Sequence, residues 1–232
     1  MMEIHPKKSL AIFSLTSCGD CFGVLKNVDW GRFSPERSVL TKLELQNFYD
    51  IDDLRGKNKI EKKYDIVIIE GHPRGKRQTD FAKLIRRQAK IVVAIGACAH
   101  QGGVYAKTNE PILKKIIRVD HTVPGCPVDR NELSRFLMDL FWGKVPRLPD
   151  LSVCFECRQN ENDCLLKKGK LCLGPITRGG CDSICNNYGE ACLGCRGLKP
   201  DANVEKMTEI LKSITPEQDI EKMMTIFGTL KE

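Results

Sequence analysis

Cysteine is the residue type whose number and spacing indicate what chemistry this chain can do. The chain has 232 residues and 12 of them are cysteines, which separate into groups of four. One group is spread through the first half, and the other eight lie between positions 154 and 195. Four thiolates can bind one [4Fe–4S] cluster or one tetrahedral zinc ion. Twelve cysteines could therefore hold three such centres, which would form an electron wire if the centres are clusters.

The eight C-terminal cysteines match neither of the two simplest metal-binding patterns. They are spaced C-x2-C-x6-C-x7-C and then C-x3-C-x6-C-x2-C. A zinc ribbon has two C-x2-C pairs about 15–20 residues apart, and a bacterial ferredoxin has the run C-x2-C-x2-C-x3-C-P. The local spacing favours iron–sulfur clusters and leaves structural zinc as an alternative.

The first half of the chain predicts an open α/β domain. Three short apolar runs rich in valine and isoleucine, at 9–15, 64–70 and 90–95, are typical of buried strands in a parallel sheet. A helix expected over 79–89 joins the last two strands into a βαβ unit. A second helix is expected over 131–142, where apolar residues recur at helical spacing.

The four N-terminal cysteines follow these strands. Cys18 and Cys21 come after the first run, Cys98 follows the run at 90–95, and Cys126 lies in a Pro-Gly-Cys-Pro segment. The carboxyl ends of parallel strands meet at one edge of a sheet, where such folds bind their ligands. We therefore expect these four thiols to lie together.

The second half has a different character. Residues 143–149 read as a linker, and the next fifty residues are rich in cysteine, glycine and asparagine. Such a segment buries too little apolar surface to fold unaided, so bound clusters would serve as its core. We predict a flavodoxin-like α/β domain over 1–146, a small irregular iron–sulfur domain over 147–200, and a helical tail over 201–232.

Charge and composition exclude several other classes of function. The formal net charge is +7 and 6% of residues are aromatic, but three clusters of roughly −2 each would offset most of that charge. Without aromatic and basic residues interleaved, nucleic-acid binding is not expected. The chain shows no signal peptide and no apolar run of about 20 residues. We expect a cytoplasmic protein with reduced thiols and no membrane span.

Several segments resemble the small subunit of nickel–iron hydrogenases. The resemblance extends over about residues 8–230 and is closest to the cytoplasmic archaeal and bacterial branch, which includes sulfhydrogenase delta subunits and small subunits of coenzyme-F420-non-reducing hydrogenases. The motifs that carry it are Thr16-Ser17-Cys18-x2-Cys21, Glu70-Gly71, Gly96-Ala97-Cys98-Ala99-x2-Gly102-Gly103, Gly125-Cys126-Pro127, Cys154-Phe155-Glu156-Cys157, Cys172-Leu173-Gly174-Pro175 and Cys192-Leu193-Gly194-Cys195-Arg196-Gly197.

The resemblance implies three ligand sets, named here by their expected distance from the nickel site. The proximal set is Cys18, Cys21, Cys98 and Cys126. The distal set is Cys154, Cys157, Cys164 and Cys172. The medial set is Cys181, Cys185, Cys192 and Cys195.

The resemblance further implies three [4Fe–4S] clusters. Respiratory relatives have a histidine at the position of Cys154 and a proline near Cys185, and this chain has cysteine at both. It departs from many relatives at Phe22-Gly23, where a carboxylate or glutamine is common, so this position lacks the polar side chain that a proton route there would use.

The implied role is electron transfer without catalytic residues of its own. The expected partners are a nickel–iron large subunit and a flavin- or iron–sulfur-containing subunit, as in NAD(P)-linked hydrogenases. Two alternatives are the equivalent subunit of a hydrogenase coupled to heterodisulfide reductase and, more distantly, a cluster subunit like that of complex I. A zinc-stabilised interaction module is the alternative from a different class.

The roles of four polar residues near the proximal set stay open at this stage. Asp20 and Glu70 are candidate carboxylates, but a turn residue and a strand-end hydrogen bonder are the simpler interpretations. His72 and His100 either contact a cluster or have surface or capping roles.

Three basic features outside the proximal set are also ambiguous. Arg178 and Arg196 either offset cluster charge or are solvated. The run 57–63 is expected to be an exposed loop or a basic docking site.

Overall fold

The computed structural model describes residues 8–28, 45–50, 63–106 and 110–228. The run 57–63 lies almost wholly outside these residues. Five strands form one parallel sheet in the order β2-β1-β3-β4-β5. The strands are β1 Leu10–Ser14, β2 Leu45–Asp50, β3 Tyr64–Glu70, β4 Ala89–Ile95 and β5 His121–Val123. This is the strand order of flavodoxin-like folds, so the expected fold class is confirmed.

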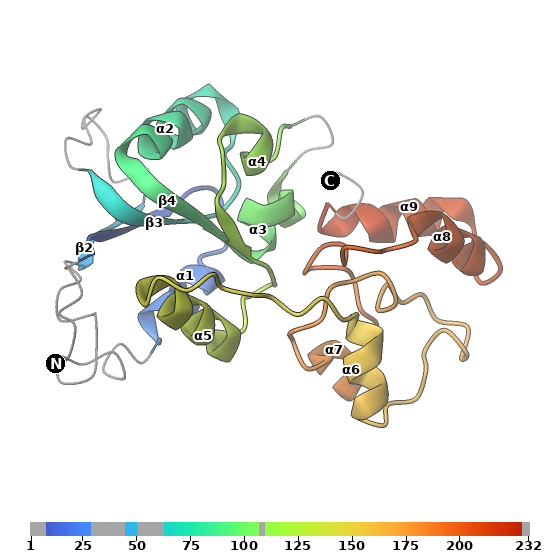
Figure 1. Cartoon of the computed structure of the whole chain (residues 1–232). Coiled ribbons are helices and arrows are strands. Elements are labelled where there is room, and N and C mark those ends of the chain that lie inside the picture. The colour runs from blue at the N-terminus through green and yellow to red at the C-terminus, as the bar shows by residue number, and fades with distance from the viewer. Residues whose placement is uncertain (1–7, 29–44, 51–62, 107–109, 229–232) are drawn as a thin grey trace, which may run out of the picture.

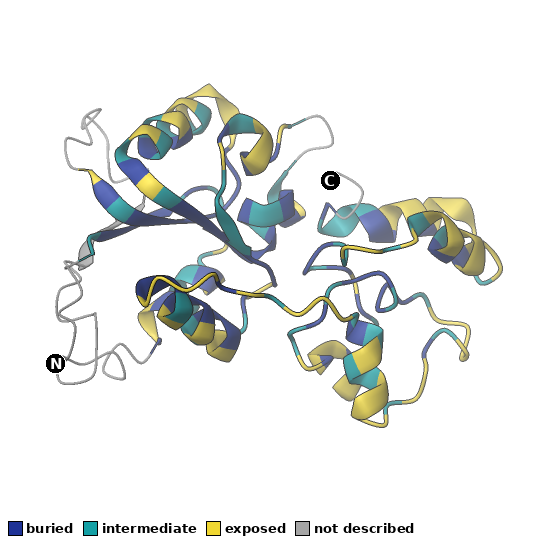
Figure 2. Ribbon diagram, in the orientation of Figure 1, coloured by how far each residue is buried: buried dark blue, intermediate teal, exposed yellow. Residues whose placement is uncertain are grey.

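Strands β1, β3 and β4 are apolar on both faces because helices cover both sides of the sheet (Figures 1 and 2). Leu10 and Ile12 of β1 pack with α1 (Asp20–Lys26) and α5 (Arg130–Phe141), while Ala11 and Phe13 pack with α2 (Gly75–Gln88) and α4 (Leu113–Ile116) on the other side. Alternate residues of a strand point to opposite faces, so a continuous apolar run serves both cores. The helices of this half are α1 Asp20–Lys26, α2 Gly75–Gln88, α3 Gly96–Gln101, α4 Leu113–Ile116 and α5 Arg130–Phe141.

The expected helices of the first half are present with shifted boundaries. The helix predicted over 79–89 begins at Gly75, and the helix predicted over 131–142 spans Arg130–Phe141. Asp129 caps α5 by accepting a 2.7 Å hydrogen bond from the Glu132 N–H. A short 3-10 turn, η3 Gly103–Tyr105, follows α3.

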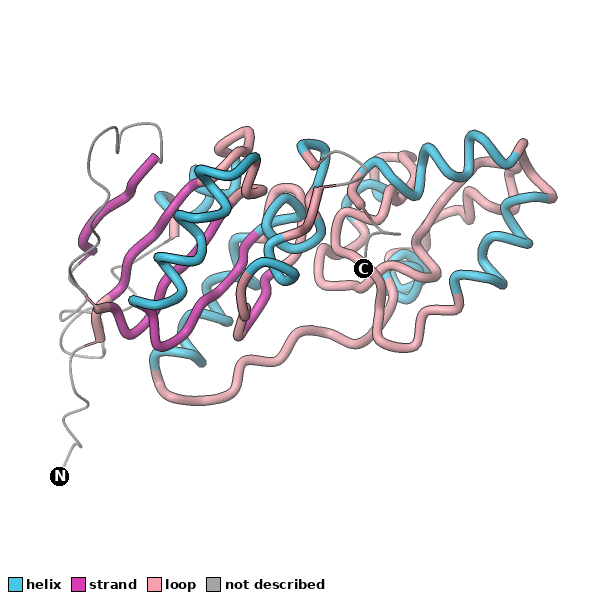
Figure 3. Tube along the Cα trace, turned by 90° about the horizontal axis from the view of Figure 1, so that it is seen from above, coloured by secondary structure: helices cyan, strands magenta, loops and turns pink. Residues whose placement is uncertain are grey.

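The C-terminal half lies beside the end of the sheet that carries the strands' carboxyl ends (Figures 1 and 3). Its helices are α6 Val153–Gln159, α7 Ile184–Asn187, α8 Val204–Lys212 and α9 Glu217–Ile226. Residues 160–183 form turns and loops without a helix or strand. The tail helices α8 and α9 pack on Leu173 and Ile176 in a separate apolar cluster. The domain boundaries at 146 and 200 stay predictions.

No helix within the described ranges combines the length and apolar composition that crossing a membrane requires.

Candidate functional site

The proximal set comes together at the carboxyl ends of β1, β4 and β5. Cys18 lies in the loop after β1 and Cys21 on α1, while Cys98 lies on α3 directly after β4. Cys126 is in the turn after β5. The thiols of Cys21 and Cys98 interact electrostatically with that of Cys126, and Cys98 interacts with Cys18. The segments that follow these three strands therefore bring the four thiols together.

Burial keeps the inner proximal thiols protonated in the absence of a bound cation. It raises the pKa of the Cys21 thiol to about 12, and that of Cys98 to about 12. Cys18 and Cys126, by contrast, are exposed. A group bound here would displace protons from the inner thiols, because metals are bound by thiolates.

Two glycines leave room beside proximal sulfur atoms. A Cβ on Gly96 would lie 2.6 Å from the Cys21 sulfur, and a Cβ on Gly103 would lie 2.7 Å from the Cys98 sulfur. Both have positive φ angles, 80° and 55°, which glycine adopts without strain. The proximal set thus fits a bulky inorganic group bound against the backbone.

The distal set surrounds a cavity of about 530 Å³. Cys154 and Cys157 lie three residues apart on α6 and so share one face of the helix. Cys164 and Cys172 come from the loop that follows, and all four cysteines line the cavity. Burial raises the pKa of Cys154 and Cys157, and the neighbouring thiols of the set raise it further.

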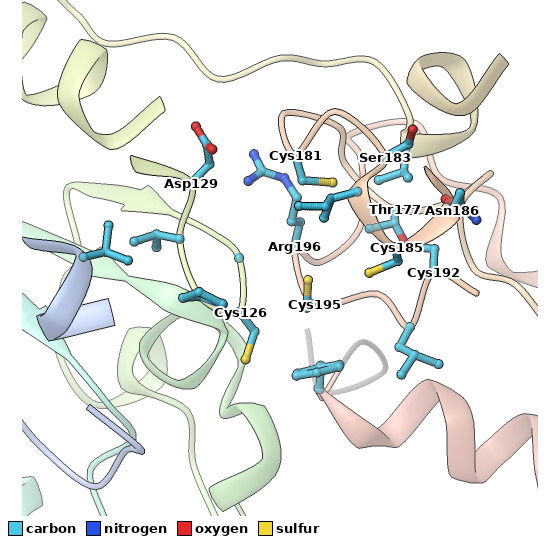
Figure 4. Close-up of a pocket in the computed structure, with 18 of the residues that line it drawn as sticks. Cys126, Asp129, Thr177, Cys181, Ser183, Cys185, Asn186, Cys192, Cys195 and Arg196 are labelled. Carbon is cyan, nitrogen blue, oxygen red and sulfur yellow. The ribbon is translucent and has the colours of Figure 1, made fainter. Parts of the chain in front are cut away.

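The medial set lines a second cavity, of about 380 Å³, together with Cys126 of the proximal set (Figure 4). Cys185 lies on α7, and the other three cysteines lie in loops. Burial raises the pKa of Cys181, Cys192 and Cys195. Within the described part of the chain, no three cysteine, histidine or carboxylate side chains converge on a single metal position. The sulfur atoms instead surround space large enough for a cluster.

Neighbouring sets adjoin one another. Cys126 of the proximal set lines the same cavity as Cys195 of the medial set, and the two thiols interact electrostatically. The Asn186 side chain, next to Cys185, lies 3.7 Å from the Cys172 sulfur and joins the medial set to the distal set. The three sets therefore follow one another in space in the order proximal, medial, distal.

The carboxylate and the histidine closest to the β3 end have structural partners. Glu70 is buried and accepts hydrogen bonds from the Ser14 hydroxyl at 2.8 Å and the Phe22 N–H at 3.3 Å. His72 is buried, and its Nε2 lies 3.2 Å from a Glu110 carboxylate oxygen. A surface role for His72 is therefore wrong, and Glu70 is a strand-end hydrogen bonder.

Two further polar residues occupy different surroundings. His100 packs against Gly197 of the C-terminal half, where a Cβ on that glycine would meet its Nε2 at 2.7 Å. Asp20 is the first residue of α1.

The two arginines of the cysteine-rich segment differ sharply. Arg178 pairs with Asp150 near the surface. Arg196 is 1% exposed and pairs with Glu132 of α5, so a solvated-surface role for it is wrong. The local sequence around Arg196 does not predict that the residue is buried, because its partner Glu132 is 64 positions away.

The flavodoxin-like fold and the three adjoining cysteine sets define a cysteine-rich α/β protein. A chain of an actinobacterial-type NiFe-hydrogenase from Ralstonia eutropha shares the fold. That chain is 18% identical with a TM-score of 0.57, and the match covers 97% of this chain and 92% of that one. A family model described as the NADH ubiquinone oxidoreductase 20 Kd subunit matches residues 33–140 and stops before the eight C-terminal cysteines.

Sequence relatives narrow the class. The delta subunit of sulfhydrogenase 2 from Pyrococcus furiosus is 32% identical over 94% of this chain and 98% of its own length. A subunit of an F420-non-reducing hydrogenase from Methanocaldococcus jannaschii is 30% identical over 61% of this chain and 67% of its own length. The chain belongs to the family of hydrogenase small subunits of the sulfhydrogenase and F420-non-reducing type.

Proposed function

We propose that this chain is the electron-transfer small subunit of a nickel–iron hydrogenase and holds three [4Fe–4S] clusters. The observation that carries the proposal is the succession of the three cysteine sets: Cys126 and Cys195 line one cavity, and Asn186 next to Cys185 contacts Cys172. A [4Fe–4S] cluster held by thiolates exchanges electrons at a potential that hydrogen bonds and burial tune. Family membership supports the hydrogenase assignment.

The residues of each set would hold one cluster. The cavities lined by the medial and distal cysteines, and the glycines beside Cys21 and Cys98, supply space and ligands of the right chemistry. Each set also reaches the surface through at least one exposed cysteine: Cys18 and Cys126, Cys164, and Cys185.

The two ends of this succession suit two different partners. We assign the nickel–iron large subunit to the side where Cys18 and Cys126 are exposed, and a flavin- or iron–sulfur-containing subunit to the side of Cys164. NAD(P)-linked coupling through that second subunit is part of the proposal. Because none of the twelve cysteines, all of which lie within the described residues, forms a disulfide, we place the complex in the reducing cytoplasm.

Metal analysis of anaerobically purified protein tests this function. We expect about twelve iron and about twelve acid-labile sulfide per chain, since each [4Fe–4S] cluster has four of each. Dithionite reduction should produce interacting cluster signals in the EPR spectrum. About three zinc per chain without sulfide would overturn the redox function and leave a zinc-stabilised interaction module.

A further inference from the structure

The buried side-chain amide of Asn186 lies in the wall between the medial and distal cavities. It lies on α7 directly after Cys185 and is 7% exposed. Its side chain lines both cavities. Figure 4 shows it on the side of the medial cavity opposite Cys126. No position in the sequence motifs pointed to this residue.

The orientation of the Asn186 amide is determined by its neighbours. Nδ2 lies 3.2 Å from the Glu190 carbonyl oxygen, which can only accept a hydrogen bond. The NH2 group must therefore face that carbonyl, and its second hydrogen is available to the Cys172 sulfur at 3.7 Å. Asn186 thus donates across the wall, from the medial helix to a distal ligand.

The carbonyl end of the same amide has no partner among the described residues. Asn186 Oδ1 is buried and accepts no hydrogen bond there. A buried amide with a purely structural role is expected to satisfy both of its ends. In Asn186 the Nδ2 group donates both of its hydrogens, whereas Oδ1 has no partner among the described residues. We therefore assign the role of Asn186 to its two donor hydrogens.

A second side chain crosses the wall in the opposite direction. Glu156 lies on α6 between Cys154 and Cys157, and it accepts hydrogen bonds from the backbone N–H groups of Gly180 and Ser183. Its Oε2 is 3.9 Å from the Cys181 sulfur. Each of the two sets therefore has a side chain, borne by its own helix, that contacts the other set.

We propose that Asn186 is a positioning residue for electron transfer between the medial and distal sets, and that its N–H···S hydrogen bond raises the reduction potential of the group held by the distal set. This inference rests on the proposed function. Reduction adds negative charge to a cluster and its ligand sulfurs, and an N–H donor stabilises that charge. The bond also holds α7 at a constant separation from Cys172.

Potentiometric EPR titration of the anaerobic protein tests the proposal, with Asn186→Leu and Asn187→Leu as matched variants. Asn187 is the exposed neighbour on α7, and its amide contacts Asn160, Ser183 and Asp182. The titration step that disappears in Cys157→Ala identifies the distal set. We expect this step to shift to lower potential in Asn186→Leu and to stay unchanged in Asn187→Leu, with the proximal step unmoved in both.

An unchanged distal step in Asn186→Leu, or an equal shift in both variants, would overturn the role of Asn186. If the Asn186→Leu protein loses the iron held by the distal set, the distal potential is measured in Asn186→Ala instead, because this change removes the donor without adding apolar bulk. Wild-type protein without iron would instead refute the proposed function, so the two failures are distinguishable.

Discussion

Arg196 and Glu132 form a buried ion pair that ties the cysteine-rich segment to helix α5, with Arg196 Nη2 2.7 Å from Glu132 Oε1. Arg196 follows Cys195 of the medial set, and its guanidinium also donates to the backbone carbonyls of Pro124 and Gly179, at 3.0 and 2.8 Å. Pro124 lies two residues before Cys126 of the proximal set. The ion pair therefore fixes the position of the medial set in the C-terminal half relative to the proximal set in the N-terminal half.

Replacing Arg196 with alanine should destabilise the protein strongly. The substitution leaves the Glu132 carboxylate and two carbonyls buried without their partner, which costs about 3–5 kcal/mol. Anaerobic denaturant unfolding measures the loss. Arg178→Ala is the control, because it breaks a partly exposed pair with Asp150 worth about 1 kcal/mol or less. Equal effects of the two variants would contradict a structural role for the buried pair.

Gly96→Ala should remove the group held by the proximal set. The added methyl would lie 2.6 Å from the Cys21 sulfur, closer than two non-bonded atoms approach. We expect loss of about four of about twelve irons per chain, measured by iron analysis, with the distal and medial EPR signals retained.

Gly143→Ala is the control that distinguishes the steric clash with the Cys21 sulfur from the backbone strain of a positive φ angle. Gly143 also has a positive φ, 71°, but a Cβ there meets nothing within 4 Å. The Gly143→Ala variant should be destabilised by roughly 1–2 kcal/mol and should retain all of its iron. Iron loss in both variants would mean that strain, not the approach to Cys21, explains the result.

Cys164→Ser should interrupt electron delivery at the distal end. Cys164 is an exposed member of the distal set, remote from the proposed nickel partner. In the complex with its large subunit, we expect hydrogen–deuterium exchange to persist while hydrogen-dependent reduction of the acceptor falls severely. Cys18→Ser, at the opposite end, should uncouple the nickel site from all acceptors. Parallel loss of both activities in Cys164→Ser would show that the distal set is structural.

Asp120→Asn should make stability less dependent on pH in acid. Burial alone would raise the pKa of Asp120, but hydrogen bonds from the Val92 N–H and the Arg86 guanidinium lower it overall. A carboxyl whose folded-state pKa is depressed stabilises the protein above its unfolded pKa of about 3.9, and that contribution is lost as pH falls through the folded value.

The stability difference between wild type and Asp120→Asn should therefore be constant from pH 6 to 8, at about 2 kcal/mol, and shrink below about pH 4. Comparing two proteins at each pH cancels acid effects common to both. A difference that grows toward low pH would contradict the assigned direction of the pKa shift.

Sequence patterns predicted β1, β3 and β4 well because these three strands are buried on both faces. The runs that became β1, β3 and β4 are continuously apolar, which is the pattern that a doubly covered parallel strand requires. β2 and β5 were not predicted. β2 has the mixed sequence Leu-Gln-Asn-Phe-Tyr-Asp and lies at the sheet edge, and β5 has three residues. An edge strand can be polar, and a strand of three residues shows no periodicity.

Cysteine positions by themselves separated four thiols that follow strand ends from eight that lie between 154 and 195, and the family resemblance supplied the division of those eight into two sets. Only the tertiary structure decided which groups touch, that Arg196 is buried against Glu132, and that Asn186 faces Cys172. These contacts join residues whose types are ordinary on a protein surface. Their roles depend on burial and on partners distant in the chain, which local sequence does not encode.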